Sequence, residues 1–402
     1  MNPKSILASR IKIARIFFII SAIYGLVLRL YSIVDFIPVE YKNILQSHSH
    51  VTFLGWGFLA VISIIGYVYH PKEFVESKYL KFLFYLMTFT LVGMLISFPL
   101  QGYKVFSIIF LSIFLITSYL YLVNILKLLK PLNILSVKYV KTGIFYYFFS
   151  SLAIWTIAII FAKIGKGEFY YNSVYFYLHF LYNGFFVFVL FGLLIKYFED
   201  QKIEFNNVSA KKFYWFTNIA VIPAYTLSVL WIKDVPNYLY YIGFIAMILQ
   251  IISLYYLFDL SKSLIKSLKI KHIKTIVYFV LVSYFLKVVL QFFSTFPQIV
   301  EQALQYKTYL IIGYLHLYTL GFMSMFIILL LKLHPKKKLN KLGINLLMIG
   351  IFLSEFFLFF QGGLLIFYDV LIPKLRIILF VVSALMPLGL LIVHFKLLLK
   401  KH

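Results

Sequence analysis

The sequence contains no cysteine and has few charged residues. Without cysteine the chain cannot form a disulfide, an iron–sulfur cluster, a thiolate copper site or a covalent c-type haem linkage. Any redox centre would therefore need His, Met, Tyr or carboxylate ligands. Only 13% of the 402 residues are charged, whereas about a quarter are charged in a soluble globular domain.

Long apolar runs fill most of the chain. Hydrophobic residues make up 63% of it and aromatic residues 20%, and most runs reach the ~20 residues needed to cross the hydrocarbon core. Clusters of Lys, Pro, Asn and Gly divide them into twelve segments, which predicts an all-α, polytopic membrane protein with twelve transmembrane helices. The predicted spans are 15–37, 46–69, 79–100, 104–126, 140–162, 173–197, 213–232, 237–258, 274–296, 307–331, 342–366 and 375–399.

The net charge of +25 is typical of chains that bind nucleic acid phosphates. Here, however, the basic residues lie between apolar spans, so we expect them to meet anionic lipid and to set the orientation of the helices. If the amino terminus is cytoplasmic, 28 of the 38 basic residues are cytoplasmic. Two more lie within spans, and the outer loops hold eight, namely Lys42, Lys104, Lys163, Lys166, Lys233, Lys307, Lys374 and Arg376. This asymmetry predicts that both termini are cytoplasmic and that the chain lies in the inner (cytoplasmic) membrane of the cell.

A short phrase occurs three times in the sequence: a histidine, four residues, a glycine and an aromatic residue. Its copies begin at His50, His179 and His316 and continue to Gly55-Trp56, Gly184-Phe185 and Gly321-Phe322. They fall on predicted helices 2, 6 and 10, and the histidines are 129 and 137 residues apart. This spacing predicts three pseudo-repeated four-helix units, about 15–126, 140–258 and 274–399, within one transmembrane domain, 1–402. We expect the three imidazoles to converge around one axis in the outer half of the membrane.

Neutral imidazole is a good ligand for iron, copper and zinc. A six-coordinate haem needs one histidine from each of two facing helices. The glycine could leave room for the macrocycle or for a neighbouring helix. A single histidine near a helix end is usually an interfacial residue with a water or backbone partner, but three matching copies argue for a metal role. His48 is the ambiguous member, because it could cap the helix or replace His50 as a ligand.

The order of these histidines resembles the haem–copper oxidase superfamily, whose large subunit has twelve helices in three four-helix arcs. There, helices 2 and 10 hold a low-spin haem and helix 6 supplies a copper ligand. By this resemblance His50 and His316 would be the axial ligands of a b-type haem, near Gly55 and Gly321, and His179 a metal ligand. The pattern His48-Ser49-His50 followed by Gly55 is closer still to the NnrS family of haem- and copper-containing membrane proteins. Electron transfer, haem handling and a response to nitric oxide are then the candidate roles, the last implied only by the NnrS resemblance.

Three departures from the oxidase pattern argue against a complete binuclear centre. Tyr314 stands where the superfamily has its second helix-10 histidine, and residues 213–232 contain no histidine. The cross-linked tyrosine motif is also missing, since Tyr182 follows His179 in a different context. Whether the chain is an enzyme therefore stays open, as does its electron-transfer partner or small-molecule substrate.

Four further residues are unusual for a membrane span. Arg29 and Arg376 lie toward the outer ends of their predicted helices, where a guanidinium group can pair with haem propionates or extend to the interface. Lys287 and Glu355 are predicted at similar depth in the bilayer, where charged groups are usually paired or functional. We interpret them as an ion pair or, alternatively, as the proton or ion path of a multi-pass transporter. A copper or zinc site made of His50, His179 and His316 is a third hypothesis.

Two His-Pro pairs, His70-Pro71 and His334-Pro335, follow predicted helices 2 and 10. Because proline disfavours helical geometry at the preceding residue, we interpret them as helix stops and not as ligands.

Overall fold

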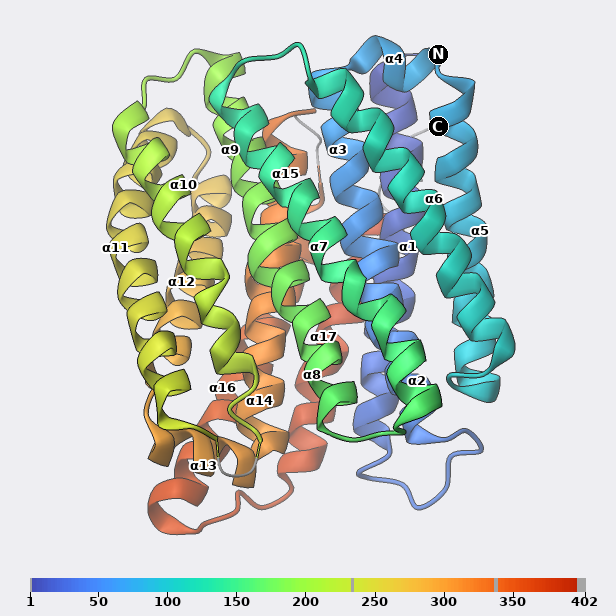
Figure 1. Ribbon diagram of the computed structural model, residues 1–402, viewed down its shortest axis with the longest axis vertical. Helices are drawn as coiled ribbons and strands as arrows, with labels where there is room; N and C mark the ends of the chain where they lie inside the picture. The colour runs from blue at the N-terminus through green and yellow to red at the C-terminus, as the bar shows by residue number, and fades with distance from the viewer. Residues whose placement is uncertain (1, 233–234, 336–338, 396–402) are drawn as a thin grey trace. The chain divides into compact units, whose positions relative to one another are not determined.

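The computed structural model describes residues 2–232, 235–335 and 339–395. Within them the regular structure is entirely helical, as the sequence predicts (Figure 1). The chain forms two compact units, which we describe separately. Unit 1 comprises Met1–Pro131 and Leu331–His402, and unit 2 comprises Leu132–Leu330.

Unit 1 contains the first and last helices of the chain. Its helices are α1 (Pro3–Leu30), α2 (Tyr41–His50), η1 (Val51–Phe58), α3 (Leu59–Tyr69), α4 (Pro71–Glu76), α5 (Lys78–Gln101), α6 (Val105–Leu129), α16 (Lys341–Tyr368) and α17 (Leu375–Phe395). Helices α1 and α17 are antiparallel neighbours. Arg15 Nε lies 3.3 Å from His394 Nδ1 near one end of the pair, and Arg376 donates to the Ser32 carbonyl near the other.

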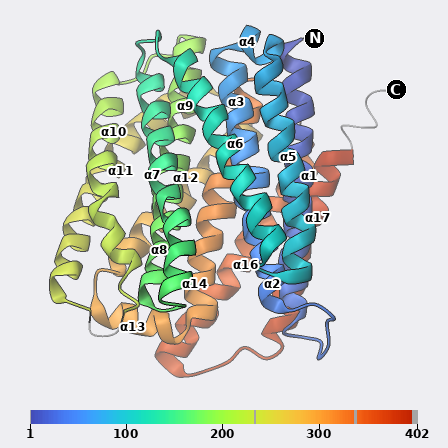
Figure 2. The ribbon, with the colours of Figure 1, turned by 45° about the vertical axis from the view of Figure 1, so that its right-hand side comes forward.

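Unit 2 contains the middle of the chain. Its helices are α7 (Leu135–Lys163), α8 (Glu168–His179), η2 (Phe180–Phe186), α9 (Val187–Gln201), α10 (Asn207–Val221), η3 (Pro223–Ser228), α11 (Asn237–Ser267), α12 (Lys271–Phe293), α13 (Pro297–Gln305), α14 (Lys307–His316), η4 (Leu317–Ser324) and α15 (Met325–Leu333), the last of which ends just beyond the unit. Helices α10 and α11 run side by side (Figure 2).

Eleven helices in the described residues are long and apolar enough to cross a membrane, which confirms the prediction of a multi-pass membrane protein. The predicted count of twelve is not confirmed. The predicted span 213–232 covers the second part of the 15-residue helix α10, which begins at Asn207, and the short 3₁₀ helix η3. The break lies at Pro223, which has no N–H group to continue the helical hydrogen bonding. The last predicted span, 375–399, extends beyond the described residues, which end at Phe395.

Both predicted helix stops are confirmed. Helix α3 ends at Tyr69, directly before His70-Pro71, and His70 leaves the helical conformation with φ −140° and ψ 64°. Helix α15 ends at Leu333, before His334-Pro335.

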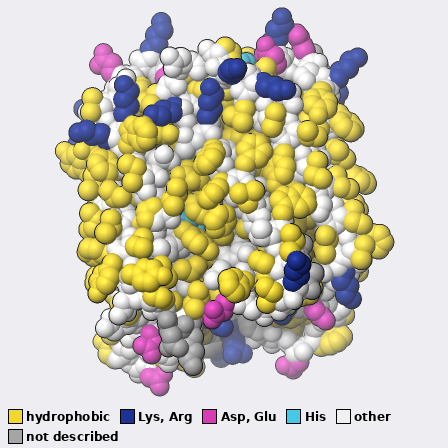
Figure 3. Space-filling view, viewed as in Figure 1, with side chains coloured by type: hydrophobic (Ala, Val, Ile, Leu, Met, Phe, Trp, Pro, Cys, Tyr) yellow, Lys and Arg dark blue, Asp and Glu magenta, His cyan; other side chains and the backbone are white. Residues whose placement is uncertain are grey.

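Among the eleven membrane-crossing helices of the described residues, the three that carry the histidine phrase are the most buried; they span Tyr41–Tyr69, Glu168–Gln201 and Lys307–Leu333. In their most apolar 18-residue windows, 89%, 94% and 78% of the residues are buried, against 35–50% for the other eight membrane-crossing helices. The other helices expose apolar side chains along much of their length (Figure 3), as expected for contact with lipid. The phrase therefore lies on interior helices.

Candidate functional site

All three copies of the histidine phrase adopt the same uncommon backbone geometry. In each copy the chain changes from an α-helix to a π-helix at the residue after the histidine, so that His50, His179 and His316 directly precede η1, η2 and η4. The wider turn shows in the hydrogen bonds that span five residues, from Leu59 to Leu54, from Val187 to Tyr182 and from Met325 to Leu320. π-Helical turns are rare and are often found at functional sites.

The glycine of each phrase allows a neighbouring helix to approach closely. A Cβ atom at these glycines would lie 2.5–2.8 Å from the neighbouring side chain, which is too close for two non-bonded atoms. The neighbours are Phe17 of α1 at Gly55, Tyr146 of α7 at Gly184 and Ser283 of α12 at Gly321. Of the two roles that the sequence leaves open for the glycine, the structure shows close helix approach in all three copies.

The aromatic residue of each phrase packs against the next residue of the same neighbouring helix. The pairs are Phe18–Trp56, Tyr147–Phe185 and Tyr284–Phe322, with ring centroids 4.6, 5.2 and 4.7 Å apart. Every pair spans 38 residues, from 18 to 56, from 147 to 185 and from 284 to 322. Each phrase thus packs against the preceding membrane-crossing helix, and the same positions pair in all three copies.

One ring nitrogen of His50 bonds to the backbone of its own helix, and the other bonds to a tyrosine. Its Nδ1 lies 2.8 Å from the Gln46 carbonyl, so Nδ1 carries the proton and donates it. Nε2 therefore has the free electron pair, which accepts the Tyr103 hydroxyl at 3.1 Å. The ring also stacks on Phe98 at 4.6 Å. An Nδ1–H group bonded to a carbonyl is the usual arrangement of a histidine that binds metal through Nε2.

His48 points toward α1. Its Nδ1 lies 2.8 Å from the Ser21 carbonyl, which again places the proton on Nδ1 and the electron pair on Nε2. Gly25 leaves room for the ring, because a Cβ atom there would lie 3.1 Å from His48 Cε1. His48 and His50 thus contact different helices and share the same tautomer.

His179 has the opposite arrangement. Its Nε2 donates to the Val221 carbonyl at 2.8 Å, and its Nδ1 accepts from the Ser228 hydroxyl at 3.2 Å. The Val221 carbonyl is available because the Tyr225 amide, its partner in a continuous helix, bonds to Ile222 in the 3₁₀ turn. Both ring nitrogens of this buried histidine are therefore hydrogen-bonded to groups at or just after the end of α10, where the helix breaks.

The second and third copies of the phrase are in direct contact within unit 2. The Tyr318 hydroxyl, two residues after His316, donates to the Tyr182 carbonyl at 2.6 Å, three residues after His179. The two tyrosine rings stack with centroids 5.0 Å apart. His316 itself is partly buried at the start of η4.

The two arginines predicted to face propionates lie at the same end of unit 1. Arg376 Nη1 donates to the Ser32 carbonyl at 3.3 Å, and the Ser32 hydroxyl donates to the Arg29 carbonyl at 2.7 Å. The Arg29 side chain also interacts electrostatically with the buried carboxylate of Glu355. Within unit 1, Glu355 thus has a positively charged neighbour that the sequence did not suggest.

Lys287 belongs to unit 2 and Glu355 to unit 1, so the ion pair proposed from the sequence stays a prediction. Lys287 is only 1% exposed. Its Nζ lies over the Tyr284 ring, 5.5 Å from the centroid.

Sequence reasoning missed the groups that fix the histidine rings, namely Ser21, Gly25, Gln46, Tyr103, Val221 and Ser228. Three of the contacts, those of Ser21, Gln46 and Val221, use backbone carbonyls, which carry no sequence signal. Shifting the sequence onto itself by 129 residues, the offset between the first two histidine copies, aligns Ser21 with Ser150 but Gly25 with Ile154, so a sequence signal exists for Ser21 and not for Gly25.

In the part of the chain that the structure describes, no group of three or more His, Cys, Asp or Glu side chains is placed to hold a metal ion. The copper or zinc centre made of three histidines has no support here. For a haem, the donor chemistry of His48 and His50 fits, because each presents an unprotonated Nε2.

The comparisons with known proteins leave the family open. No protein-family model matches the chain, and no curated protein is significantly similar to it in sequence.

Proposed function

We propose that this protein is a b-type haem-binding protein of the inner (cytoplasmic) membrane, similar in architecture to the large subunit of haem–copper oxidases. His50 and His316 are the proposed axial ligands, with His48 as the alternative to His50. The observation that carries this proposal is the shared geometry of the histidine phrase. Three interior helices each change to a π-helix directly after a histidine, and each packs its glycine and aromatic residue in one register.

The tautomer of His50 supports a ligand role. Donation from Nδ1 to the Gln46 carbonyl fixes the ring plane and makes Nε2 the basic nitrogen. The competing hydrogen bond from Tyr103 is a single neutral contact at 3.1 Å. Such a bond contributes about 0.5–1.5 kcal/mol, which is small beside coordination to iron. His48 makes the equivalent bond to Ser21.

The proposal gives His179 a structural role. Both its nitrogens are engaged with Val221 and Ser228, so coordination would require breaking a buried hydrogen bond. Together with the histidines missing from residues 213–232 and from position 314, this leaves no complete set of copper ligands. We therefore favour electron transfer or a response to nitric oxide over oxygen reduction, the second role being implied only by the NnrS resemblance.

When bound, a bis-histidine haem supplies one-electron redox chemistry. The residues of this chain would hold the iron through Nε2 of His50 and of His316. Arg29 and Arg376, at one end of unit 1, would balance the propionate charges, with Glu355 modulating Arg29. An electron-transfer partner or a small molecule would exchange electrons with the haem.

The test is the optical spectrum of the purified protein expressed with ample haem. We expect a reduced b-type spectrum that is lost in His50→Ala and in His316→Ala and is retained in His70→Ala. His70 is a suitable control because it lies at a helix end beside Glu73, 3.8 Å away. A colourless wild-type protein that is folded and monodisperse would overturn the proposal.

A second candidate function, a transporter, is favoured by the burial of Lys287 and Glu355, which are 1% and 6% exposed. Buried charges in membrane spans often mark substrate or ion paths. Transport by this protein should depend on Lys287 and Glu355 more than on His50 and His316. The spectrum and a transport assay on the same variants separate the two functions.

A further inference from the structure

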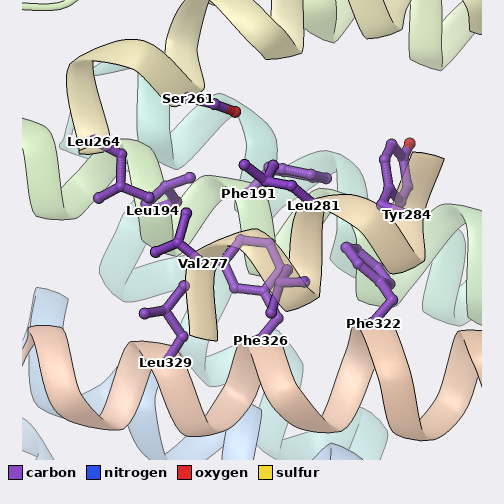
Figure 4. A pocket seen from close by; sticks show the side chains of 11 residues that line it. Phe191, Leu194, Ser261, Leu264, Val277, Leu281, Tyr284, Phe322, Phe326 and Leu329 are labelled. Atoms are coloured by element: carbon purple, nitrogen blue, oxygen red, sulfur yellow. The ribbon is translucent and has the colours of Figure 1, made fainter. Parts of the chain in front are cut away.

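A small apolar cavity lies inside unit 2, where α9, α11, α12 and α15 meet. Side chains such as Phe191, Leu281 and Phe326 line it, and its volume of about 10 Å³ is room for one water molecule (Figure 4). This cavity is too small for a ligand. The helix α13, in contrast, has the features of a binding surface on the outside of the same unit.

Helix α13 joins two membrane-crossing helices. Residues 294–296 separate it from the end of α12, and Tyr306 alone separates it from the start of α14. Figures 1 and 2 both show it at the ends of these two helices. Because both neighbours are part of helices long and apolar enough to cross the membrane, α13 is held at a membrane surface. With nine residues it is too short to cross the hydrocarbon core itself.

The sequence of α13 separates apolar from polar residues. At 3.6 residues per turn, each type of residue falls on its own face of the helix. The apolar face consists of Ile299, Val300, Ala303 and Leu304, and the polar face consists of Gln298, Glu301, Gln302 and Gln305. This separation is typical of a helix that lies along a boundary between an apolar and a polar medium.

Only the middle of the apolar face packs against the protein. Val300 is 8% exposed, whereas Ile299 and Leu304, to either side of it on the helix, are 37% and 36% exposed. Phe296, directly before the helix, is 39% exposed, and Phe293 at the end of α12 is 46% exposed. The exposed apolar surface of the membrane-crossing helix α12 thus continues without a break onto α13.

The lipid interface is the partner that fits this surface. Lipid would cover the exposed apolar flanks, while the polar face would stay among headgroups and water. Tyr306 and Tyr309 follow directly, and tyrosine is enriched at membrane–water interfaces. Glu301 is the one charged residue of α13, so the helix lacks the basic residues that attract anionic lipid. Its affinity for lipid must therefore be apolar.

We propose that α13 is an interfacial anchor that lies parallel to the membrane surface and binds phospholipid whatever the headgroup charge. Ile299 and Leu304 reach toward the acyl chains, at a depth of about 5–10 Å in the interface. The two neighbouring helices tether α13 at this level, so a short helix suffices. The anchor lies wholly within unit 2 and does not depend on whether the protein binds haem.

Because the chain has no cysteine, a single nitroxide label can be placed on the full chain, reconstituted in phosphatidylcholine vesicles. The measurement compares collisions with oxygen, which concentrates in lipid, and with a water-soluble nickel chelate. Labels at Ile299→Cys and Leu304→Cys should have an oxygen-to-nickel ratio several-fold higher than labels at Gln298→Cys and Gln305→Cys. The last two are matched controls, since both residues are exposed on the polar face of the same helix.

Val282→Cys calibrates the ratio for a lipid-facing position, because Val282 is 54% exposed in the middle of α12. Equal ratios on the two faces of α13 would overturn the proposal. It would also be overturned if neither reagent reached positions 299 and 304, since a second copy of the chain would then cover them. Adding phosphatidylglycerol should leave the profile unchanged, and a profile that requires it would refute apolar binding. If one label on the apolar face prevents folding, the other decides.

Discussion

Tyr318 donates its hydroxyl proton to the main-chain carbonyl of Tyr182, which joins two copies of the histidine phrase that are 137 residues apart in the sequence. The hydroxyl satisfies a carbonyl inside a π-helix, where the hydrogen-bonding pattern of the helix is altered. The same two rings stack with planes 20° apart. The contact fixes η4 against η2 within unit 2 by one polar and one aromatic interaction.

Tyr318→Phe should separate these two interactions. It keeps the stacked ring and removes only the hydroxyl, leaving the Tyr182 carbonyl without this donor. We expect a loss of about 1–2 kcal/mol in the free energy of unfolding, measured by thermal unfolding in detergent. Tyr278→Phe, on an exposed ring of α12, should change stability by less than about 0.5 kcal/mol. Equal stability of the two variants would show that the hydroxyl contact contributes nothing.

Gly55→Ala should destabilise unit 1, because the added Cβ would lie 2.8 Å from Phe17 Cβ. Overpacking of this kind costs about 1–3 kcal/mol, and the Phe18–Trp56 stack would have to shift. Gly363→Ala is the control in the same unit, since no atom lies within 4 Å of its added Cβ. It should be neutral or up to about 1 kcal/mol more stable, because alanine favours helix. Thermal unfolding of both variants checks the difference, and a stable Gly55→Ala would refute the packing role.

Tyr103→Phe should strengthen haem binding. The Tyr103 hydroxyl occupies Nε2 of His50, the nitrogen proposed to bind iron. Removing a competing bond of about 0.5–1.5 kcal/mol should raise haem affinity by roughly two- to tenfold, measured by titrating haem into protein made without it. Unchanged or weaker binding would argue that His48, or neither histidine, is the ligand.

His179→Ala should cost stability and leave haem binding intact. The substitution breaks the bonds to Val221 and Ser228 and opens a cavity at a buried position. We expect a loss of about 2–4 kcal/mol with an unchanged ratio of haem to protein. If haem content fell while the unfolding midpoint stayed the same, His179 would be a ligand after all.

The sequence predicted the parts of the fold that depend on composition and on local chain chemistry. Apolar length identified the membrane-crossing helices, and the prolines after His70 and His334 identified where two of them end. Pro223 was equally visible, but the apolar run from 213 to 232 concealed the break it makes. The change to π-helix had no local signal, since the phrase reads as an ordinary apolar helix.

The candidate site was only partly predictable, for a physical reason. The histidine positions repeat in the sequence, whereas the protonation of each ring depends on which carbonyl lies next to it. Gln46 sits one turn before His50, but the Val221 carbonyl meets His179 only because another helix breaks at Pro223. Likewise, the Arg29–Glu355 interaction joins the beginning and the end of the chain, which no local pattern reveals.

The most direct test of the proposed function is the electron paramagnetic resonance spectrum of the oxidised, haem-loaded protein. Axial ligation by His50 and His316 predicts a low-spin ferric signal in the wild type. The signal should become high-spin, or disappear with the haem, in His50→Ala and in His316→Ala. A wild-type protein that contains no haem, or a low-spin signal that survives both substitutions, would contradict the account.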